Sequence, residues 1–513
     1  MILLWLIVIL IAGGILALIA GRVNRRLCPW IALISVLAGL GLSLFLWADQ
    51  PTGDPGDWVV SYRRTWIPDW GISLHLALDG LSLLMVLLTF FLGTLAVLAS
   101  WTEITQRTGF YYFNLLWILA GICGVFLALD LFLFYFFWEL MLIPMYFLIG
   151  IWGSGNRVYA AYKFFIFTQT GGLLMLLAIL GLYFIHGAVT GQYTFNYDDL
   201  LGTGMPAGTA GWLMAGFMIA FLIKLPVVPF HTWLPDAHGE APTAGSLILA
   251  GLLLKTGAYG ILRFAVPLFP GAAEALAPLA MILGTIGIIY GAVLAYSQTD
   301  LKRLVAYTSV SHMGFVILGI FAFNELALQG VVIQLLTHGI STGALFLIAG
   351  MLKDRLHTRD LDRMGGLWTG MPRLGGVTLL FVMASLGLPG LGNFVAEFLI
   401  LLGSFRADIA ITVIACTGLV FSAVYSLRIM QRIFLGGRED RDHVLPDLNV
   451  REGLSMAVLC LSILWLGIYP QPVLDRSLPF IDHFRDRLGS VAVANAAADG
   501  AAERSDLTEQ RHD

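Results

Sequence analysis

Residues Phe221–Lys255 read FLIKLPVVPFHTWLPDAHGEAPTAGSLILAGLLLK. Two lysines, Lys224 and Lys255, each lie within an apolar run of this stretch. Pro226 and Pro229 follow the first lysine at once. Proline in a helix interior removes a backbone hydrogen bond and clashes with the preceding turn. The pattern therefore predicts a helix that breaks directly after one lysine, followed by a second helix that holds the other.

The composition of the whole chain indicates a membrane protein. Of its 513 residues, 58% are hydrophobic and only 12% are charged, whereas soluble domains carry about 25% charged residues. Apolar runs of roughly 20 residues, each long enough to cross a bilayer, recur along the chain. We therefore predict an all-α polytopic membrane protein with about 14 transmembrane helices. The spans are expected at residues 2–20, 29–47, 78–99, 111–129, 131–151, 160–185, 210–231, 242–265, 274–296, 302–322, 327–350, 374–402, 410–434 and 453–470.

Two sets of five spans show the same internal order. Glu139 precedes Lys224 by 85 residues (224 − 139), and His312 precedes Glu397 by 85 residues (397 − 312). In both sets the fourth member is broken, the second time at Pro389 and Gly390. An odd number of spans per set gives the two sets opposite orientations, as in inverted-repeat transporters. An ordinary proline kink is the alternative reading of each break.

This order predicts a division of the chain into segments. Spans one to three are expected in 1–110, with an extracytoplasmic loop at 48–77 that contains a short hairpin. The five-helix repeats occupy 111–265 and 274–434, the last span occupies 453–470, and 471–513 is expected to be a largely disordered tail.

Basic residues predict the orientation. One set of loops carries most of the lysines and arginines, while the opposite loops hold only Arg63, Arg64, Arg263 and Arg406. Because cytoplasmic loops of membrane proteins are enriched in lysine and arginine, both termini are expected on the periplasmic side.

A few ionisable side chains lie inside the spans. A charge at mid-bilayer costs roughly 2.5–3.5 kcal/mol on insertion scales, so it must face a partner or a wet cavity. An isolated Glu–Lys pair can be structural, and a buried histidine is more often packing than function. Six titratable groups on six spans instead favour a chain of proton sites. They are Glu139, Lys224, Lys255, His312, His338 and Glu397.

Cofactor and metal sites are not expected in this chain. The four cysteines lie far apart without a CxxC motif, which argues against a disulfide framework, a zinc site or an iron–sulfur cluster. His231, Asp236, His238 and Glu240 have a metal-like composition, but they lie in the proline-interrupted turn without metal-binding spacing.

Three stretches resemble the antiporter-like membrane subunits of respiratory complex I. They are KLPVVPFHTWLPDAHGEAPTAGSLILAGLLLKTGAYGILRF, YSQTDLKRLVAYTSVSHMGF and LGLPGLGNFVAEFLILLGSF. The resemblance extends from about Gly80 to Tyr469. Two paralogues in that complex, L and N, generally carry lysine where this chain has Glu397, and the third carries glutamate.

The resemblance implies a function. Glu139 and Lys224 match the family's pair at the start of a proton path, and Lys255 matches the lysine of its central axis. His312 and His338 match connecting residues, and Glu397 matches the terminal acid. It further implies that flavin mononucleotide, iron–sulfur clusters and quinone belong to other subunits of a bacterial NADH–quinone oxidoreductase. The expected partners are paralogues L and N, lipid, water and protons, without nucleic acid, in the bacterial inner membrane.

Three other functions remain open on the sequence. A subunit of a multi-subunit sodium/proton antiporter fits the sequence apart from Glu397 and the stretches, such as HTRDLDRMGGLW, that resemble the third paralogue. A membrane-bound hydrogenase subunit is related in the same way. A scaffold that transports nothing is the alternative from another class, and it predicts that neutralising Lys224 or Lys255 affects assembly only.

Overall fold

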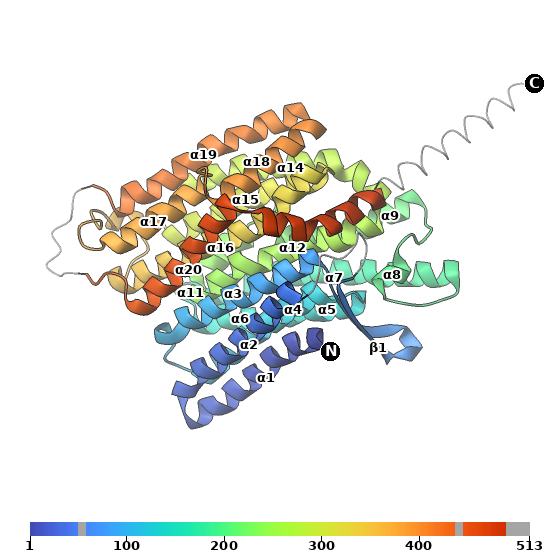
Figure 1. Cartoon of the computed structure of the whole chain (residues 1–513), viewed down its shortest axis with the longest axis horizontal. Coiled ribbons are helices and arrows are strands. Elements are labelled where there is room, and N and C mark those ends of the chain that lie inside the picture. The colour runs from blue at the N-terminus through green and yellow to red at the C-terminus, as the bar shows by residue number, and fades with distance from the viewer. Residues whose placement is uncertain (50–57, 437–444, 489–513) are drawn as a thin grey trace, which may run out of the picture.

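The computed structural model describes residues 1–49, 58–436 and 445–488 (Figure 1). In these residues, 13 helices are long and apolar enough to cross a membrane. Two shorter helices, α17 (Pro372–Ser385) and α18 (Gly392–Ala407), meet at residues 386–391 and together form a further, interrupted span. The prediction of an all-α polytopic membrane protein is confirmed, and this interrupted span brings the number of crossings to the expected 14.

The N-terminal part combines three spans with a small hairpin. Its elements are α1 (Ile2–Val23), the 3₁₀ turn η1 (Arg25–Leu27), α2 (Cys28–Asp49), β1 (Val60–Ile67), the 3₁₀ turn η2 (Pro68–Trp70), β2 (Ile72–Leu78) and α3 (Gly80–Glu103). The strands are antiparallel, and Gly71, with φ of 64°, follows the turn between them. The expected hairpin within 48–77 is therefore present, while residues 50–57 of that loop lie outside the described part.

The hairpin is fastened to the loops of the bundle. Asp130, fully buried, accepts hydrogen bonds from Ser73 N at 2.8 Å and Ser73 Oγ at 3.0 Å. His75 Nδ1 lies 2.7 Å from Asn196 Oδ1. These side-chain contacts give β2 a fixed position at one end of the helices.

The middle of the chain holds five spans, several of them in pieces. The elements are α4 (Thr108–Leu127), α5 (Leu131–Leu140), α6 (Leu142–Trp152), α7 (Arg157–Thr190), α8 (Tyr197–Leu200), α9 (Ala207–Lys224), α10 (Trp233–Glu240), α11 (Thr243–Ile248), the π-helical stretch η3 (Leu249–Leu253), α12 (Leu254–Gly260), the π-helical stretch η4 (Ile261–Ala265) and α13 (Val266–Leu268). Together, α11 to α13 form one continuous span. The two π-helical stretches were not predicted, since no proline or glycine pair marks them.

The remaining spans complete the bundle. They are α14 (Pro270–Ser297), α15 (Leu301–Phe321), α16 (Glu325–Leu356), the 3₁₀ turn η5 (Leu361–Arg363), α17, α18, α19 (Ile409–Ile433) and α20 (Val450–Ile468). Figure 1 shows α1 and α2 at one edge and α19 at the opposite edge. The span of α11 to α13 and the helices α15 and α16 are almost entirely enclosed.

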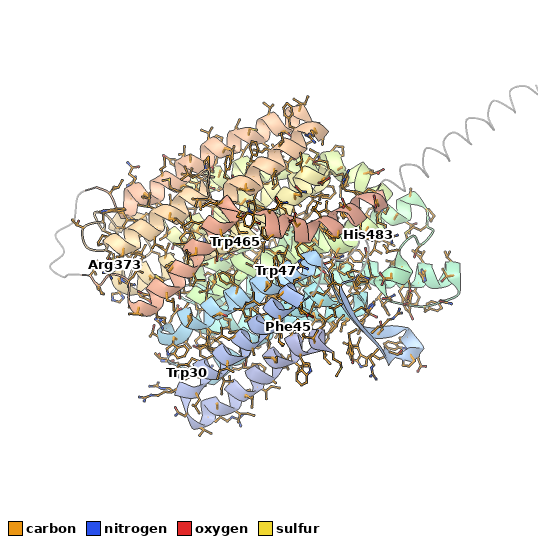
Figure 2. All side chains as sticks on the ribbon, in the orientation of Figure 1. Trp30, Phe45, Trp47, Arg373, Trp465 and His483 are labelled. Carbon is orange, nitrogen blue, oxygen red and sulfur yellow. The ribbon has the colours of Figure 1, made fainter. Side chains whose placement is uncertain are left out.

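Outer helix faces carry large apolar side chains. Trp30, Phe45 and Trp465, labelled in Figure 2, are 55%, 54% and 44% exposed. A soluble protein rarely exposes contiguous apolar surface on this scale. The outer faces are thus suited to lipid, and the enclosed helices form the interior.

The end of the described chain corrects the prediction of a disordered tail. Residues 471–488 are helical, and Figure 1 shows them in dark red at an angle to α20. Side chains on one face are buried, at Val473, Phe480, Ile481, Phe484 and Leu488. Apart from the adjacent pair Phe480 and Ile481, these positions are three, four or seven residues apart, and they make an apolar stripe that stabilises a helix on the bundle. Residues 489–513 lie outside the described part.

Arg263 also departs from its expected position in a loop. It lies in η4, is 3% exposed, and forms an ion pair with Asp79, the N-cap residue of α3. Its guanidinium lies 5.0 Å from the ring centroid of Trp58 and 4.8 Å from that of Phe480. Because the counter-charge of Asp79 is supplied inside the fold, the arginine is tolerated there. Four segments distant in sequence meet at this residue.

We predict that Asp79→Ala will destabilise the protein strongly. Removing one partner of a buried ion pair leaves the other charge uncompensated, which costs about 3–5 kcal/mol. The midpoint of thermal unfolding in detergent should fall accordingly. The control is Arg63→Ala, which removes an exposed pair with Asp199 and should cost about 1 kcal/mol or less. Equal effects of the two variants would contradict the role assigned to Arg263.

Candidate functional site

Lys255 lies at the centre of the enclosed helices. It belongs to α12, between the two π-helical stretches, and its side chain is fully buried. Lys255 Nζ donates to Ala250 O at 2.6 Å, inside η3, and to His338 Nδ1 at 2.6 Å. π-helical turns are rare and are frequently found at functional sites. Here one of them supplies a carbonyl group to a buried ammonium.

From His338 a row of polar side chains continues across α15 and α18. The rings of His338 and His312 have centroids 5.6 Å apart. His312 Nδ1 donates to Glu397 Oε1 at 3.0 Å, and Tyr425 OH and Ser385 Oγ both lie 3.3 Å from His312 Nε2. The structure thus brings together four of the six predicted residues, Lys255, His338, His312 and Glu397. They come from four spans, which sequence spacing alone could not join.

Glu139 and Lys224 form a separate group. In the described residues no ion pair within 4.0 Å joins them, and Lys224 Nζ has no hydrogen-bond partner. The ammonium instead lies 5.2 Å from the ring centroid of Trp138 and 5.6 Å from that of Phe164. In the described residues Glu139 Oε1 is buried without a hydrogen-bond partner, and the carboxylate interacts electrostatically with Lys224.

The lysine of this pair is stabilised by aromatic faces, which attract cations when water is excluded. Glu139 is half-buried and lies against Gly172 of α7. The two charges are therefore electrostatically coupled but not in contact. The strength of their electrostatic interaction therefore changes when either side chain moves.

Both predicted helix breaks lie beside a charged residue of the site. Helix α9 ends at Lys224, and the chain turns through Pro226 and Pro229 before α10 begins. Trp233 Nε1 donates to Ile223 O at 2.9 Å, which satisfies one of the carbonyl groups left at the end of α9.

The second break, at residues 386–391, contains Pro389 and Gly390. Gly387 and Gly390 have φ values of 80° and 92°, which favour glycine. The hydrogen atoms of Gly387 face Glu397 Oε2. The absence of a side chain at this turn leaves space beside the carboxylate.

Two further buried groups, His238 and Lys302, were not among the predicted site residues. His238 is fully buried, stacks on Phe346 with centroids 4.5 Å apart, and has no hydrogen-bond partner on either ring nitrogen in the described residues. Lys302, expected as a loop charge, is 1% exposed. Its ammonium donates to Ala241 O at 2.8 Å and Ser246 Oγ at 3.3 Å.

Lys302 and its neighbours fasten the turn between α10 and α11. Ala241 is the C-cap residue of α10, so the ammonium of Lys302 satisfies a free helix-end carbonyl and complements the helix dipole. At the start of α11, Glu103 accepts from Thr243 N at 3.2 Å and 3.3 Å. The signal in the sequence was only the position of Lys302 in the first turn of its helix.

The two carboxylates of the group with metal-like composition are engaged by other side chains. Asp236 accepts from Lys163 and Arg303, each at 2.7 Å, and Glu240 accepts from Ser154 Oγ at 3.3 Å. In the described ranges, no group of three or more His, Cys, Asp or Glu side chains is arranged to hold a metal ion.

Comparison of the chain with known proteins identifies the family to which it belongs. The transmembrane family described as NADH:quinone oxidoreductase/Mrp antiporter matches residues 128–422. NADH-quinone oxidoreductase subunit M of Pseudomonas aeruginosa is 55% identical over 96% of this chain and 98% of its own length. The protein of the same name from Escherichia coli K12 is 53% identical over 93% and 96%.

Solved structures have the same fold. A chain of respiratory complex I from Thermus thermophilus with bound NADH superposes with a TM-score of 0.86 at 31% identity, over 95% of this chain and all of that one. A chain of the Mrp complex from a Dietzia species superposes with a TM-score of 0.83 at 23% identity, over 94% and 97%. The second likeness concerns the fold alone.

We predict that Lys302→Met will loosen the turn between α10 and α11. The substitution leaves Ala241 O without its donor, and an unpaired buried carbonyl costs about 1–3 kcal/mol. Hydrogen exchange of residues 233–246 should accelerate, and Lys302→Arg should reduce that effect. Arg432→Met, which removes an exposed pair with Asp362, is the control. Unchanged exchange in the methionine variant would contradict the capping role.

Proposed function

The chain belongs to the family of NADH-quinone oxidoreductase subunit M, and we propose that its proton travels along the buried row from Lys255 to Glu397. As a member of this family it is a proton-translocating subunit of the membrane arm of respiratory complex I, a multi-pass membrane protein without redox chemistry of its own. The observation that carries the proposal is the sequence of contacts that joins four titratable side chains inside the membrane.

The row is built for proton transfer. The ammonium of Lys255 can give a proton to His338 Nδ1 across their 2.6 Å contact. An imidazole accepts a proton on one nitrogen and releases one from the other, so each histidine can pass charge onward. His312 Nδ1, 3.0 Å from Glu397 Oε1, delivers the proton to the carboxylate. The two histidines are not in hydrogen-bond contact, so water must connect them.

Glu139 and Lys224 control the entry of the proton. A nearby carboxylate favours the charged form of a lysine, and burial favours the neutral form. When Glu139 stays away from Lys224, the balance shifts toward release of the lysine proton, which then moves toward Lys255. The observed separation of the pair supports a state of this kind. The aromatic rings around Lys224 stabilise its ammonium until the lysine releases its proton.

The wider organisation follows the same proposal. The segments 111–265 and 274–434 act as two inverted five-helix repeats, each broken in its fourth member, and spans one to three with the last span flank them. Both chain termini lie on the periplasmic side of the bacterial inner membrane. Paralogues L and N are the neighbouring subunits, and flavin mononucleotide, iron–sulfur clusters and quinone act on other subunits. The similarity to subunit M sequences extends over nearly the whole chain, and it supports a role in complex I over a role as a sodium/proton antiporter or a scaffold.

We predict that Lys224→Ala and Glu139→Ala will each reduce proton pumping severely without preventing assembly of the complex. Proton pumping driven by NADH and quinone should fall by about tenfold or more, the equivalent of ~1.4 kcal/mol on the limiting barrier. NADH oxidation with an artificial acceptor should persist, because the flavin site is elsewhere. Arg63→Ala, on the hairpin, is the control. Full pumping by a variant would remove that residue from the path.

Substitutions of Glu397 give a sharper prediction. Glu397→Gln should abolish most pumping because an amide cannot take up the proton from His312. Glu397→Lys should retain partial pumping, since paralogues use lysine at this position. Vesicles with equal amounts of assembled complex provide the comparison. Equal pumping by the glutamine variant and the native protein would show that Glu397 is not the terminal acceptor.

A further inference from the structure

Gln334 is the most conspicuous polar residue that the relay leaves unused. It lies on α16, is fully buried, and neither Oε1 nor Nε2 has a hydrogen-bond partner in the described residues. Buried polar groups are almost always hydrogen-bonded, to protein or to ordered water. An amide with both ends unpaired is costly to bury in a dry site. The side chain therefore indicates a place where water is bound.

Contacts between α16 and α18 show what Gln334 faces. Gly330 packs so closely on α18 that a methyl group there would meet Ile400 N at 2.7 Å and Ala396 O at 2.8 Å. Further along, Asn393 Nδ2 donates to Ser341 Oγ at 3.1 Å. Positions 330, 334, 337 and 341 share one face of a helix. Gln334 therefore lies on the face toward α18, at the level of Asn393 and Ala396.

Other unpaired polar atoms gather in the same region. Asn393 Oδ1, Glu397 Oε2 and His338 Nε2 are buried without a partner in the described residues. Asn393 and Glu397 are one turn apart on α18, and Gln334 and His338 are one turn apart on α16. A buried water molecule typically makes about three hydrogen bonds to groups that would otherwise be unsatisfied. Two facing helices thus present both donors and acceptors to such molecules.

We propose that Gln334, with Asn393, binds the internal water molecules that connect His338 with the His312–Glu397 pair, including the free Oε2 of Glu397. Gln334 acts as a positioning residue: its amide donates to one water and accepts from another, and so orients them for proton transfer. The proposal rests on the relay described above and adds a site to it. It also accounts for a fully buried amide without a protein partner at the contact of α16 with α18.

The decisive variant is Gln334→Met. Methionine has a shape similar to glutamine, and the amide that it replaces has water molecules rather than protein groups as partners, so no protein group loses a direct hydrogen bond. The proposal therefore expects an unusual combination: a thermal midpoint close to that of the native complex, and NADH-driven proton pumping reduced by about tenfold or more. Gln334→Glu, which keeps a donor and an acceptor when protonated, should preserve most of the pumping.

Two controls keep the result interpretable. Thr337→Val lies on the same face of α16, but the Thr337 hydroxyl already donates to Ile333 O at 3.0 Å, so pumping should be unchanged. Glu397→Gln, measured in the same vesicles, tests the relay itself. If Glu397→Gln blocks pumping while Gln334→Met pumps normally, the water site is refuted and the relay stands. If Glu397→Gln pumps normally, the relay fails first.

The remaining outcomes also decide. A Gln334→Met variant that fails to assemble, or whose midpoint falls, would show that the amide makes contacts needed for folding and would overturn the proposal. A glutamate variant as inactive as the methionine variant would do the same. Loss of pumping at full stability, with recovery in Gln334→Glu, is the result that supports it.

Discussion

An ammonium group buried without a counter-ion is the constraint that organises the interior of this protein. In the described residues no carboxylate lies within ion-pair distance of Lys255, which has only Ala250 O and His338 as partners. A buried ammonium must be solvated by protein groups or by water, because lipid hydrocarbon cannot solvate it. The helices around Lys255 are accordingly the most enclosed in the bundle. Its own span departs from regular α-helix on either side of it, which places a carbonyl oxygen within its reach.

The proposed path has two parts with different physical character. From Lys255 to Glu397 the polar side chains are close enough for protons to move along hydrogen bonds and short water links. Around Lys224 the contacts are with aromatic rings, and the interaction with Glu139 is electrostatic rather than direct. A contiguous part can conduct, while a part governed by charge separation can be controlled. The division suits a subunit whose energy source lies in other chains.

The sequence predicted the spans well because length and apolar composition decide whether a segment enters a bilayer. Pro226 and Pro389 marked the interruptions, since the chemistry of proline acts locally. The π-helical stretches beside Lys255 escaped prediction because packing produced them without any breaker residue. Arg263 was misplaced because its partner, Asp79, is distant in sequence. Gln334 carries no formal charge, so nothing in composition separated it from ordinary helix packing, and His238 stood out only as one of four residues with metal-like composition. Their importance appears only when hydrogen-bond partners are sought and not found.

The long helix α7 provides a measure of depth. Tyr162 and Tyr183 are 21 residues apart (183 − 162), about 32 Å along the helix axis at 1.5 Å per residue. Tyrosines are enriched at membrane–water interfaces, and the hydrocarbon core is about 30 Å thick, so the two side chains fit its boundaries. The midpoint between them falls at Gly172, which lies against the Glu139 carboxylate. Glu139 therefore lies near the bilayer centre, and its side chain is only half-buried within this chain. Lipid tails cannot solvate a carboxylate at that depth, so protein or water must cover it in the assembled membrane arm.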